Sequence, residues 1–104
     1  GVIAFMANDI AFQTASLSKL RELATHLSQQ SDEAVLVQAQ LAEGETSELA
    51  EKRFRVVQNY LEKEFHVAPE RLVLDDKRYA GEWPEFKMYL LKMNLRYENL
   101  SAGK

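Results

Sequence analysis

The segment "LAEKRFRVVQNYL", residues 49–61, has the hydrophobic spacing of an amphipathic helix. At an advance of about 100° per residue, Arg53 falls inside an arc that also holds Leu49, Val56, Val57 and Tyr60. A guanidinium stays charged near neutral pH, and burying it without a partner is unfavourable. The sequence therefore predicts a helix whose apolar side carries an arginine that has to meet another group.

Composition limits the classes of protein to which the chain can belong. Its 104 residues, 46% hydrophobic and 28% charged, are the size and make-up of a single domain over residues 1–104. The net charge is -3 and basic residues alternate with acidic ones, so the basic patch expected of a nucleic-acid-binding protein is missing. The absence of cysteine excludes disulfides and thiolate metal sites but leaves the compartment open.

The start of the sequence suggests a piece of a longer protein. The chain opens on "GVIAFM", a strand-like run, and contains no signal peptide and no run near the roughly 20 apolar residues of a membrane helix. We expect any membrane anchor or export signal to lie upstream, and residues 98–104 to form a loose tail.

Hydrophobic periodicity predicts six main elements. In chain order they are a strand at 2–6 followed by a bend and a short apolar run at 10–12, a helix beginning with Ser16 as N-cap, a strand at 34–41, a helix from Thr46 or Ser47 to about Phe65, a strand at 71–76, a loop at 77–86 and a strand at 91–97. The order β-α-β-α-β-β predicts an α+β fold, a two-layer sandwich with both helices on one face of a small mixed sheet. We expect the second and third strands to be parallel neighbours.

The loop "AEGETS", residues 42–47, joins the carboxyl end of the second strand to the amino end of the second helix. Small α/β folds tend to place ligands at this position. Arg53 lies about two turns into the helix that follows, so the loop and Arg53 together are the candidate binding site.

The spacing around Arg53 resembles that of the OmpA-like peptidoglycan-binding domains, including the periplasmic domains of MotB-type stator subunits. Leu49-Ala50, Arg53-Phe54, Val57 and Leu61 match the pattern of the family's second helix, with Ala50 and Phe54 in place of the usual small partners. The segments "DIAFQTASLSKLRELATHL" and "RLVLDDKRYAGEWP" resemble other parts of the family, so the likeness spans nearly the whole chain. The resemblance implies the OmpA-like version of the fold described above.

The same resemblance implies a ligand site and shows a departure from it. In the family, an aspartate after the second strand joins the helix arginine in binding the diaminopimelate residue of the peptide stem. Strict spacing places that aspartate at Gln38 and the strand frame places it at Ala42, and neither residue is acidic. Glu43 or Glu45 could replace it. The candidate peptidoglycan-binding residues are therefore Arg53, Ala42, Glu43, Glu45 and Gln40.

Two interpretations of Arg53 follow. In one, the guanidinium holds a ligand carboxylate through two parallel hydrogen bonds. In the other, its stem packs on Leu49 and Val57 while its head reaches water or a loop glutamate. The first agrees with a non-catalytic periplasmic domain that binds peptidoglycan and anchors a larger cell-envelope complex, such as a MotB-like stator or a secretion-linked proton channel. The second agrees with an OmpA-like fold that has lost this ligand and serves as a protein interaction or dimerisation module.

The remaining conspicuous residues favour structural roles. His26 and His66 have no further metal ligands at a suitable spacing, so we expect no metal site and no cofactor. Asp75 and Asp76 could form an acid–base pair, but a strand-ending turn explains them better. The aromatic residues Tyr79 and Trp83 flank Gly81 and either mark a partner surface or cover the core. No nucleophile motif is present, and we do not expect an enzyme. Peptidoglycan, other envelope proteins and a second copy of the chain are the expected partners.

Overall fold

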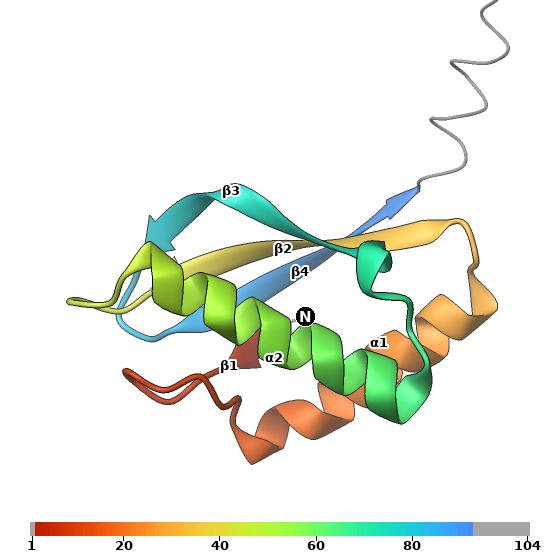
Figure 1. Cartoon of the computed structure of the whole chain (residues 1–104), viewed down its shortest axis with the longest axis horizontal. Coiled ribbons are helices and arrows are strands. Elements are labelled where there is room, and N and C mark those ends of the chain that lie inside the picture. Colours follow the sequence, from red (N-terminus) through yellow and green to blue (C-terminus); the bar gives the residue numbers. More distant parts are fainter. Residues whose placement is uncertain (1, 93–104) are drawn as a thin grey trace, which may run out of the picture.

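Two helices pack against a four-stranded mixed sheet in the computed structural model, which describes residues 2–92 (Figure 1). The sheet order is β1-β4-β2-β3; β2 and β3 are parallel, and the other neighbours are antiparallel. The elements are β1 (Val2–Ala4), η1 (Thr14–Ser16), α1 (Leu17–Gln29), β2 (Glu33–Leu41), α2 (Ser47–Phe65), η2 (Pro69–Arg71), β3 (Leu72–Ala80) and β4 (Glu85–Lys92). The α+β class, the order of the elements and the parallel pairing of β2 with β3 are confirmed.

The limits of α2 agree with the sequence pattern. The Thr46 side chain accepts a hydrogen bond from the backbone N–H of Leu49, so it caps the first turn, and Glu48 lies where the helix dipole favours an acid. The helix ends at Phe65 because His66 adopts a left-handed conformation with φ 59°. The chain then turns toward β3 and completes the connection that makes β2 and β3 parallel.

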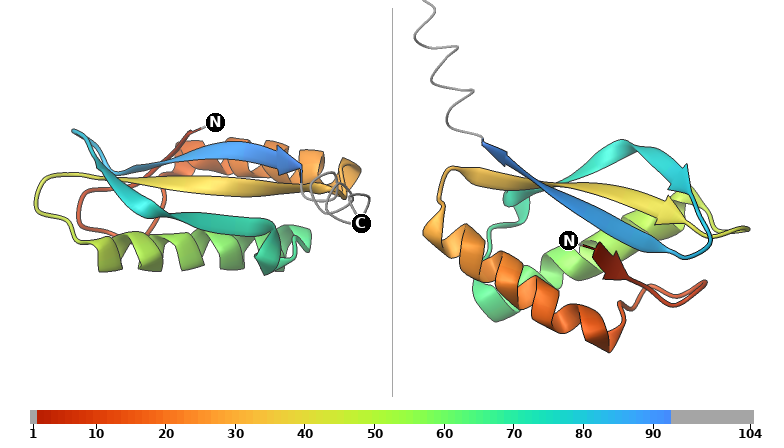
Figure 2. Two further views of the ribbon diagram at one scale, coloured as in Figure 1. Left: turned by 90° about the horizontal axis from the view of Figure 1, so that it is seen from above. Right: turned by 180° about the vertical axis from the view of Figure 1, so that it is seen from behind.

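Both helices cover one face of the sheet, as Figure 2 shows from two further sides. The β2 residues Val35, Val37 and Ala39 point toward the helices and are fully buried. They join a core to which each helix contributes the apolar side chains of its buried face: Leu20, Ala24 and Leu27 from α1, and Ala50, Val57 and Leu61 from α2. The other face of the sheet carries no helix in the described part of the chain.

The amino-terminal expectations need two corrections. Ser16 occupies the predicted N-cap position of α1, but its side chain makes no capping hydrogen bond; its hydroxyl accepts the backbone N–H of Ala4 at 3.1 Å and so joins the helix start to β1. The run at 10–12 forms no strand and contributes a single bridge, between Phe5 and Phe12. Since β1 ends at Ala4, the first strand is shorter than the apolar run that predicted it.

The carboxyl-terminal half differs most from the expectation. Residues 77–80, predicted to be loop, continue β3, and β4 begins at Glu85 rather than at Leu91. The polar residues at the start of the predicted loop suggested that the strand had ended. They are compatible with a strand because β3 lies at the edge of the sheet, where side chains can be solvated. The strand predicted at 91–97 therefore begins inside β4, and its part beyond Lys92 lies outside the described residues, as does the expected tail at 98–104.

A bulge in β3 explains the two adjacent aspartates. Val37 of β2 pairs with Leu74 of β3, and Ala39 pairs with Arg78. The three β3 residues 75–77 therefore lie opposite a single residue of β2. The Asp75 carboxylate accepts the backbone N–H of Lys77 within this bulge. The expectation of a strand-ending turn was therefore wrong in one respect: Asp75 does shape a local irregularity, but the strand continues past it.

Arg71 ties the beginning of β3 to the end of α1. Its guanidinium donates to the backbone carbonyls of Leu27, Gln30 and Glu33 at 2.6 to 3.0 Å. The carbonyls at a helix end lack partners within the helix, and a cation there also interacts favourably with the helix dipole. One side chain thus fixes the α1–β2 connection against β3.

We predict that Arg71→Ala lowers the free energy of unfolding by about 2 to 3 kcal/mol, because three carbonyls lose a charged donor. Arg71→Lys should recover little of this loss, since an ammonium cannot reach three divergent carbonyls. Urea denaturation of both variants measures the effect. The matched control is Arg55→Ala, which removes an exposed arginine of α2; equal stability of all three variants would contradict the assignment.

Candidate functional site

Arg53 lies inside the protein. Its side chain is 1% exposed, and its guanidinium makes four hydrogen bonds to oxygen atoms of the chain itself. Nε donates to the carbonyl of Asp9 at 2.7 Å, and Nη2 donates to the carbonyl of Met6 at 3.3 Å. Nη1 and Nη2 both donate to the carboxylate of Glu45, at 2.9 and 2.6 Å. This is the two-bond fork that suits a carboxylate, and its partner is a glutamate of the same chain.

The Glu45 carboxylate is equally well satisfied. Its side chain is 1% exposed, and besides the two bonds from Arg53 it accepts the backbone N–H groups of Asn8 at 2.8 Å and Ala42 at 2.9 Å. Four donors match the approximately four acceptor positions of a carboxylate. Neither charge is left unpaired, which is the condition for burying an ion pair without a large loss of stability.

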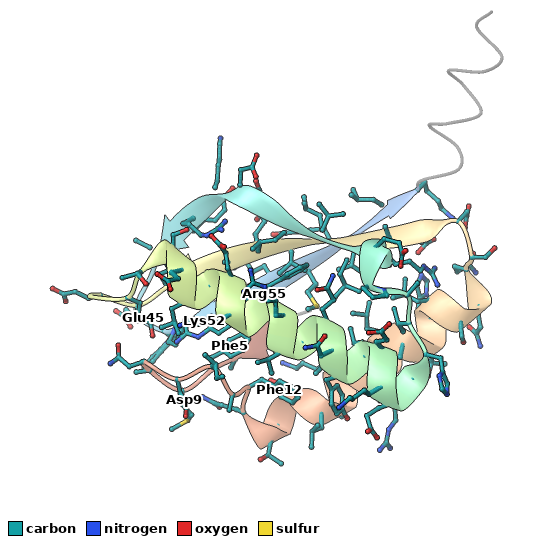
Figure 3. All side chains as sticks on the ribbon, viewed as in Figure 1. Phe5, Asp9, Phe12, Glu45, Lys52 and Arg55 are labelled. Carbon is teal, nitrogen blue, oxygen red and sulfur yellow. The ribbon has the colours of Figure 1, made fainter. Side chains whose placement is uncertain are left out.

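Three segments that are distant in the sequence bring these groups together: residues 5–13 after β1, residues 42–46 after β2, and the first turns of α2. Figure 3 shows Phe5, Asp9 and Glu45 gathered at the same end of α2. Asn8 has φ 60°, a left-handed conformation that asparagine tolerates well, and its backbone N–H donates to Glu45. The loop conformations and the ion pair therefore support one another.

The aromatic ring of Phe5 covers the pair from the core side. The Arg53 Cζ atom lies 5.2 Å from the centroid of this ring, a distance suited to a cation–π interaction. The Arg53 hydrogen bonds, aided by those from the Asn8 and Ala42 backbone, outweigh the effect of burial and lower the pKa of Glu45 from 4.5 to about 2. Glu45 is therefore ionised at neutral pH and is the buried counter-ion of Arg53.

The other predicted site residues are not part of the same cluster, except for Ala42, which supplies its backbone N–H. Glu43 is exposed on the loop. Gln40 lies on the opposite face of the sheet from the helices, and its amide donates to the carbonyl of Trp83 at 2.8 Å. Gln38 lies on that face too and reaches Asp75. Of the two acidic loop residues, Glu43 and Glu45, it is Glu45 that pairs with Arg53.

The buried position of Arg53 bears on both interpretations of its role. A guanidinium that is 1% exposed cannot reach a ligand in this conformation, and it does not extend its head into water either. The alternative of a loop glutamate as partner is the one that the structure contains, although the pair is buried rather than at the surface. The sequence did not indicate the roles of the Met6 and Asp9 carbonyls, because backbone acceptors leave no signature in the residue types.

A second ionic cluster involves His26, for which the sequence favoured a structural role. His26 Nε2 lies 2.5 Å from Glu33 Oε1, and Lys92 Nζ lies 2.8 Å from Glu33 Oε2. Hydrogen bonds from Lys92 and then His26 hold the pKa of Glu33 below its ordinary value. His66 ends α2. Within residues 2–92, no three acidic, histidine or cysteine side chains cluster as metal ligands would.

The aromatic residues flanking Gly81 do not cover the core. Trp83 is 65% exposed and Tyr79 is 39% exposed, so of the two alternatives given by the sequence, the exposed fractions disagree with a cover over the core. None of the helices within residues 2–92 has the length and apolar character needed to cross a membrane.

No protein-family model matches this sequence, and no curated protein shows significant similarity to it. The resemblance to OmpA-like domains therefore rests on residue spacing alone.

We predict a loss of stability in acid that depends on Glu45. Because its pKa in the folded state lies below the ordinary value of 4.5, the ionised form stabilises the fold above about pH 4.5, and this contribution disappears as the pH falls toward 2. Glu45→Gln should lower the free energy of unfolding at pH 7 by about 3 to 5 kcal/mol, because Arg53 keeps its charge without a buried counter-ion.

Denaturant unfolding of wild type and Glu45→Gln at a series of pH values between 2 and 7 measures both effects. The difference between the two proteins should shrink as the pH falls below about 4.5. Glu43→Gln, a change at an exposed neighbour in the same loop, is the matched control and should follow the wild type. A constant difference over this pH range would show that the charge of Glu45 does not stabilise the fold.

Proposed function

We propose that this domain is a non-catalytic protein interaction module with an OmpA-like fold whose ligand-binding arginine has become a structural residue. The observation that carries this proposal is an apolar row across the helix-free face of the sheet. Leu36 of β2 lies directly between Val73 of β3 and Tyr89 of β4 in the register. Leu91 follows two positions further along β4 on the same face.

These side chains are exposed to an extent that is unusual for adjacent apolar residues. Val73 and Tyr89 are each 47% exposed, and Leu91 is 42% exposed. Antiparallel strands that face water on one side ordinarily place polar residues there. Neighbouring exposed apolar side chains mark sites where another molecule binds, because covering them removes apolar surface from water. The expected homodimer and the expected envelope partners are both candidates for this surface.

The geometry gives less support to the peptidoglycan-binding function. The hydrogen bonds that would hold a stem-peptide carboxylate are made to Glu45, so a ligand would have to displace a buried partner that already makes four hydrogen bonds. The loop that carries Glu45 would also have to move, together with the backbone of residues 6–9. A periplasmic location and attachment to a larger envelope complex remain parts of the proposal that the family resemblance alone supports.

The two functions predict different consequences of Arg53→Lys. If Arg53 is structural, the variant should lose about 2 to 4 kcal/mol of unfolding free energy, because an ammonium cannot reproduce the fork to Glu45 and the bonds to two carbonyls. Wild type and variant should both remain in the supernatant when centrifuged with purified peptidoglycan sacculi. Thermal or urea unfolding and sacculus co-sedimentation are therefore measured on the same proteins.

Arg55→Lys is the control, since it makes the same chemical change at an exposed position of the same helix. It should affect neither measurement. Wild-type protein that sediments with sacculi, combined with an Arg53→Lys variant that stays folded and no longer sediments, would replace the interaction module with the peptidoglycan anchor.

A further inference from the structure

The helix-free face of the sheet has an ordered pattern of residue types. Because Val35 and Val37 of β2 point toward the helices, the intervening residues of β2 and the residues that pair with them lie on the other face. They form three successive rows across neighbouring strands: Val73, Leu36 and Tyr89; then Gln38, Lys87 and Val2; then Tyr79, Gln40, Glu85 and Ala4. The first row is apolar, the second carries a base, and the third carries an acid.

An exposed tryptophan lies beyond the third row. Trp83 precedes Glu85 by two residues, and its side chain is 65% exposed. The amide of Gln40 in the third row donates to the Trp83 carbonyl at 2.8 Å, so the backbone of Trp83 is held at this end of the face. The face therefore has exposed aromatic residues at both ends, Tyr89 at one and Trp83 at the other, with the two charges between them.

The central charges, Glu85 and Lys87, form no ion pair with any residue in the range 2–92. They are two positions apart on β4, so their side chains start about 7 Å from each other along the strand. An acid and a base at this spacing, with apolar groups on either side, form a pattern that reads as its own complement when it is turned end to end.

A twofold rotation brings the complementary groups together. The axis that does so lies between two facing sheets, crosses the strands, and passes midway between Glu85 and Lys87. Each residue of β4 then lies over the residue at the same distance on the other side of the axis. Glu85 meets Lys87 of the other copy, Tyr89 meets Trp83 of the other copy, and symmetry makes each contact occur twice.

We propose that the helix-free faces of two copies of this chain pack against each other as a twofold-symmetric dimer centred on reciprocal Glu85–Lys87 ion pairs. This inference rests on the proposed interaction function and names a second copy as the partner. Charge complementarity selects this occupant, because a surface with one sign of charge would repel either Glu85 or Lys87, whereas a second copy pairs both. Two sheets that pack face to face keep their strands within about 30° of each other, which keeps the central rows in contact.

Apolar burial and charge have different parts in this interface. Val73 and Tyr89 are each 47% exposed in the single chain, so covering them and Trp83 removes apolar surface from water and favours association. The charges set the register. Moving the axis onto Glu85 or onto Lys87 would place that residue against its own copy, and like charges across an interface repel.

Charge reversals test the proposal by sedimentation velocity on the whole 104-residue chain, between about 1 μM and 1 mM. Wild type should change from monomer to dimer within this range. Glu85→Lys and Lys87→Glu should each raise the Kd of the dimer about tenfold or more, because both central pairs become pairs of like charge.

Combining the two changes identifies the twofold arrangement. The double variant Glu85→Lys/Lys87→Glu should dimerise about as well as wild type, because the exchanged charges still meet in reciprocal pairs. An equimolar mixture of the two single variants should also form dimers, because two acids of one copy then face two bases of the other. Recovery in the mixture shows at the same time that both single variants are folded. Failure of both combinations to recover would overturn the proposed register.

Two further variants separate this face from the rest of the surface. Trp83→Ala should raise the Kd about tenfold, because an exposed aromatic residue is removed from the interface. Lys19→Glu makes the same charge reversal at an exposed position of α1, on the helix side of the sheet, and should leave the Kd unchanged. A dimer that responds to Lys19→Glu and to none of the changes on the helix-free face would overturn the assignment of the interface.

Wild-type protein that stays monomeric up to about 1 mM would overturn the choice of a second copy as the partner. The helix-free face would then belong to a different protein, or to residues of this chain outside the range 2–92. Sacculus co-sedimentation of wild type and Arg53→Lys tests the interaction function itself, so the two proposals fail on different measurements.

Discussion

The buried ion pair between Arg53 and Glu45 connects three parts of the chain: α2, the loop after β1 and the loop after β2. Each member of the pair makes four hydrogen bonds, and the donors and acceptors come from α2 and from the loops after β1 and β2. Removing one member of a buried pair leaves an uncompensated charge, which is far more destabilising than replacing both members together. The conformation of both loops, and the position of Phe5 beneath them, therefore depends on this single contact.

The same contact limits what this end of the domain can bind. A carboxylate supplied by the chain itself is held at the guanidinium at high effective concentration, so a carboxylate from solution competes at a disadvantage. The binding surface proposed above lies instead on the sheet. Apolar side chains of β4 are exposed on both of its faces: Leu90 on the helix side, and Tyr89 and Leu91 on the other.

Much of the fold could be predicted from the sequence because its signals are local. The capping residue Thr46 and the helical spacing up to Phe65 set both limits of α2, and the alternation in β2 showed which of its residues face the core. The failures occurred where position in the sheet overrides local pattern. The charged residues of β3 are compatible with a strand because that strand is at an edge, and β4 begins earlier than its apolar alternation indicated because its pairing with β2 starts at Glu85.

For the candidate site, the sequence by itself determined that Arg53 lies on the apolar side of a helix and that a partner was required. It narrowed the acidic candidates to Glu43 and Glu45. Only the tertiary structure decided that Glu45 is the partner and that the pair is closed to solvent, because that outcome depends on the path of two loops and on backbone carbonyls that every residue possesses. Helical spacing determines the side of the helix on which a charge lies, whereas the group that it meets is decided by segments distant in the sequence.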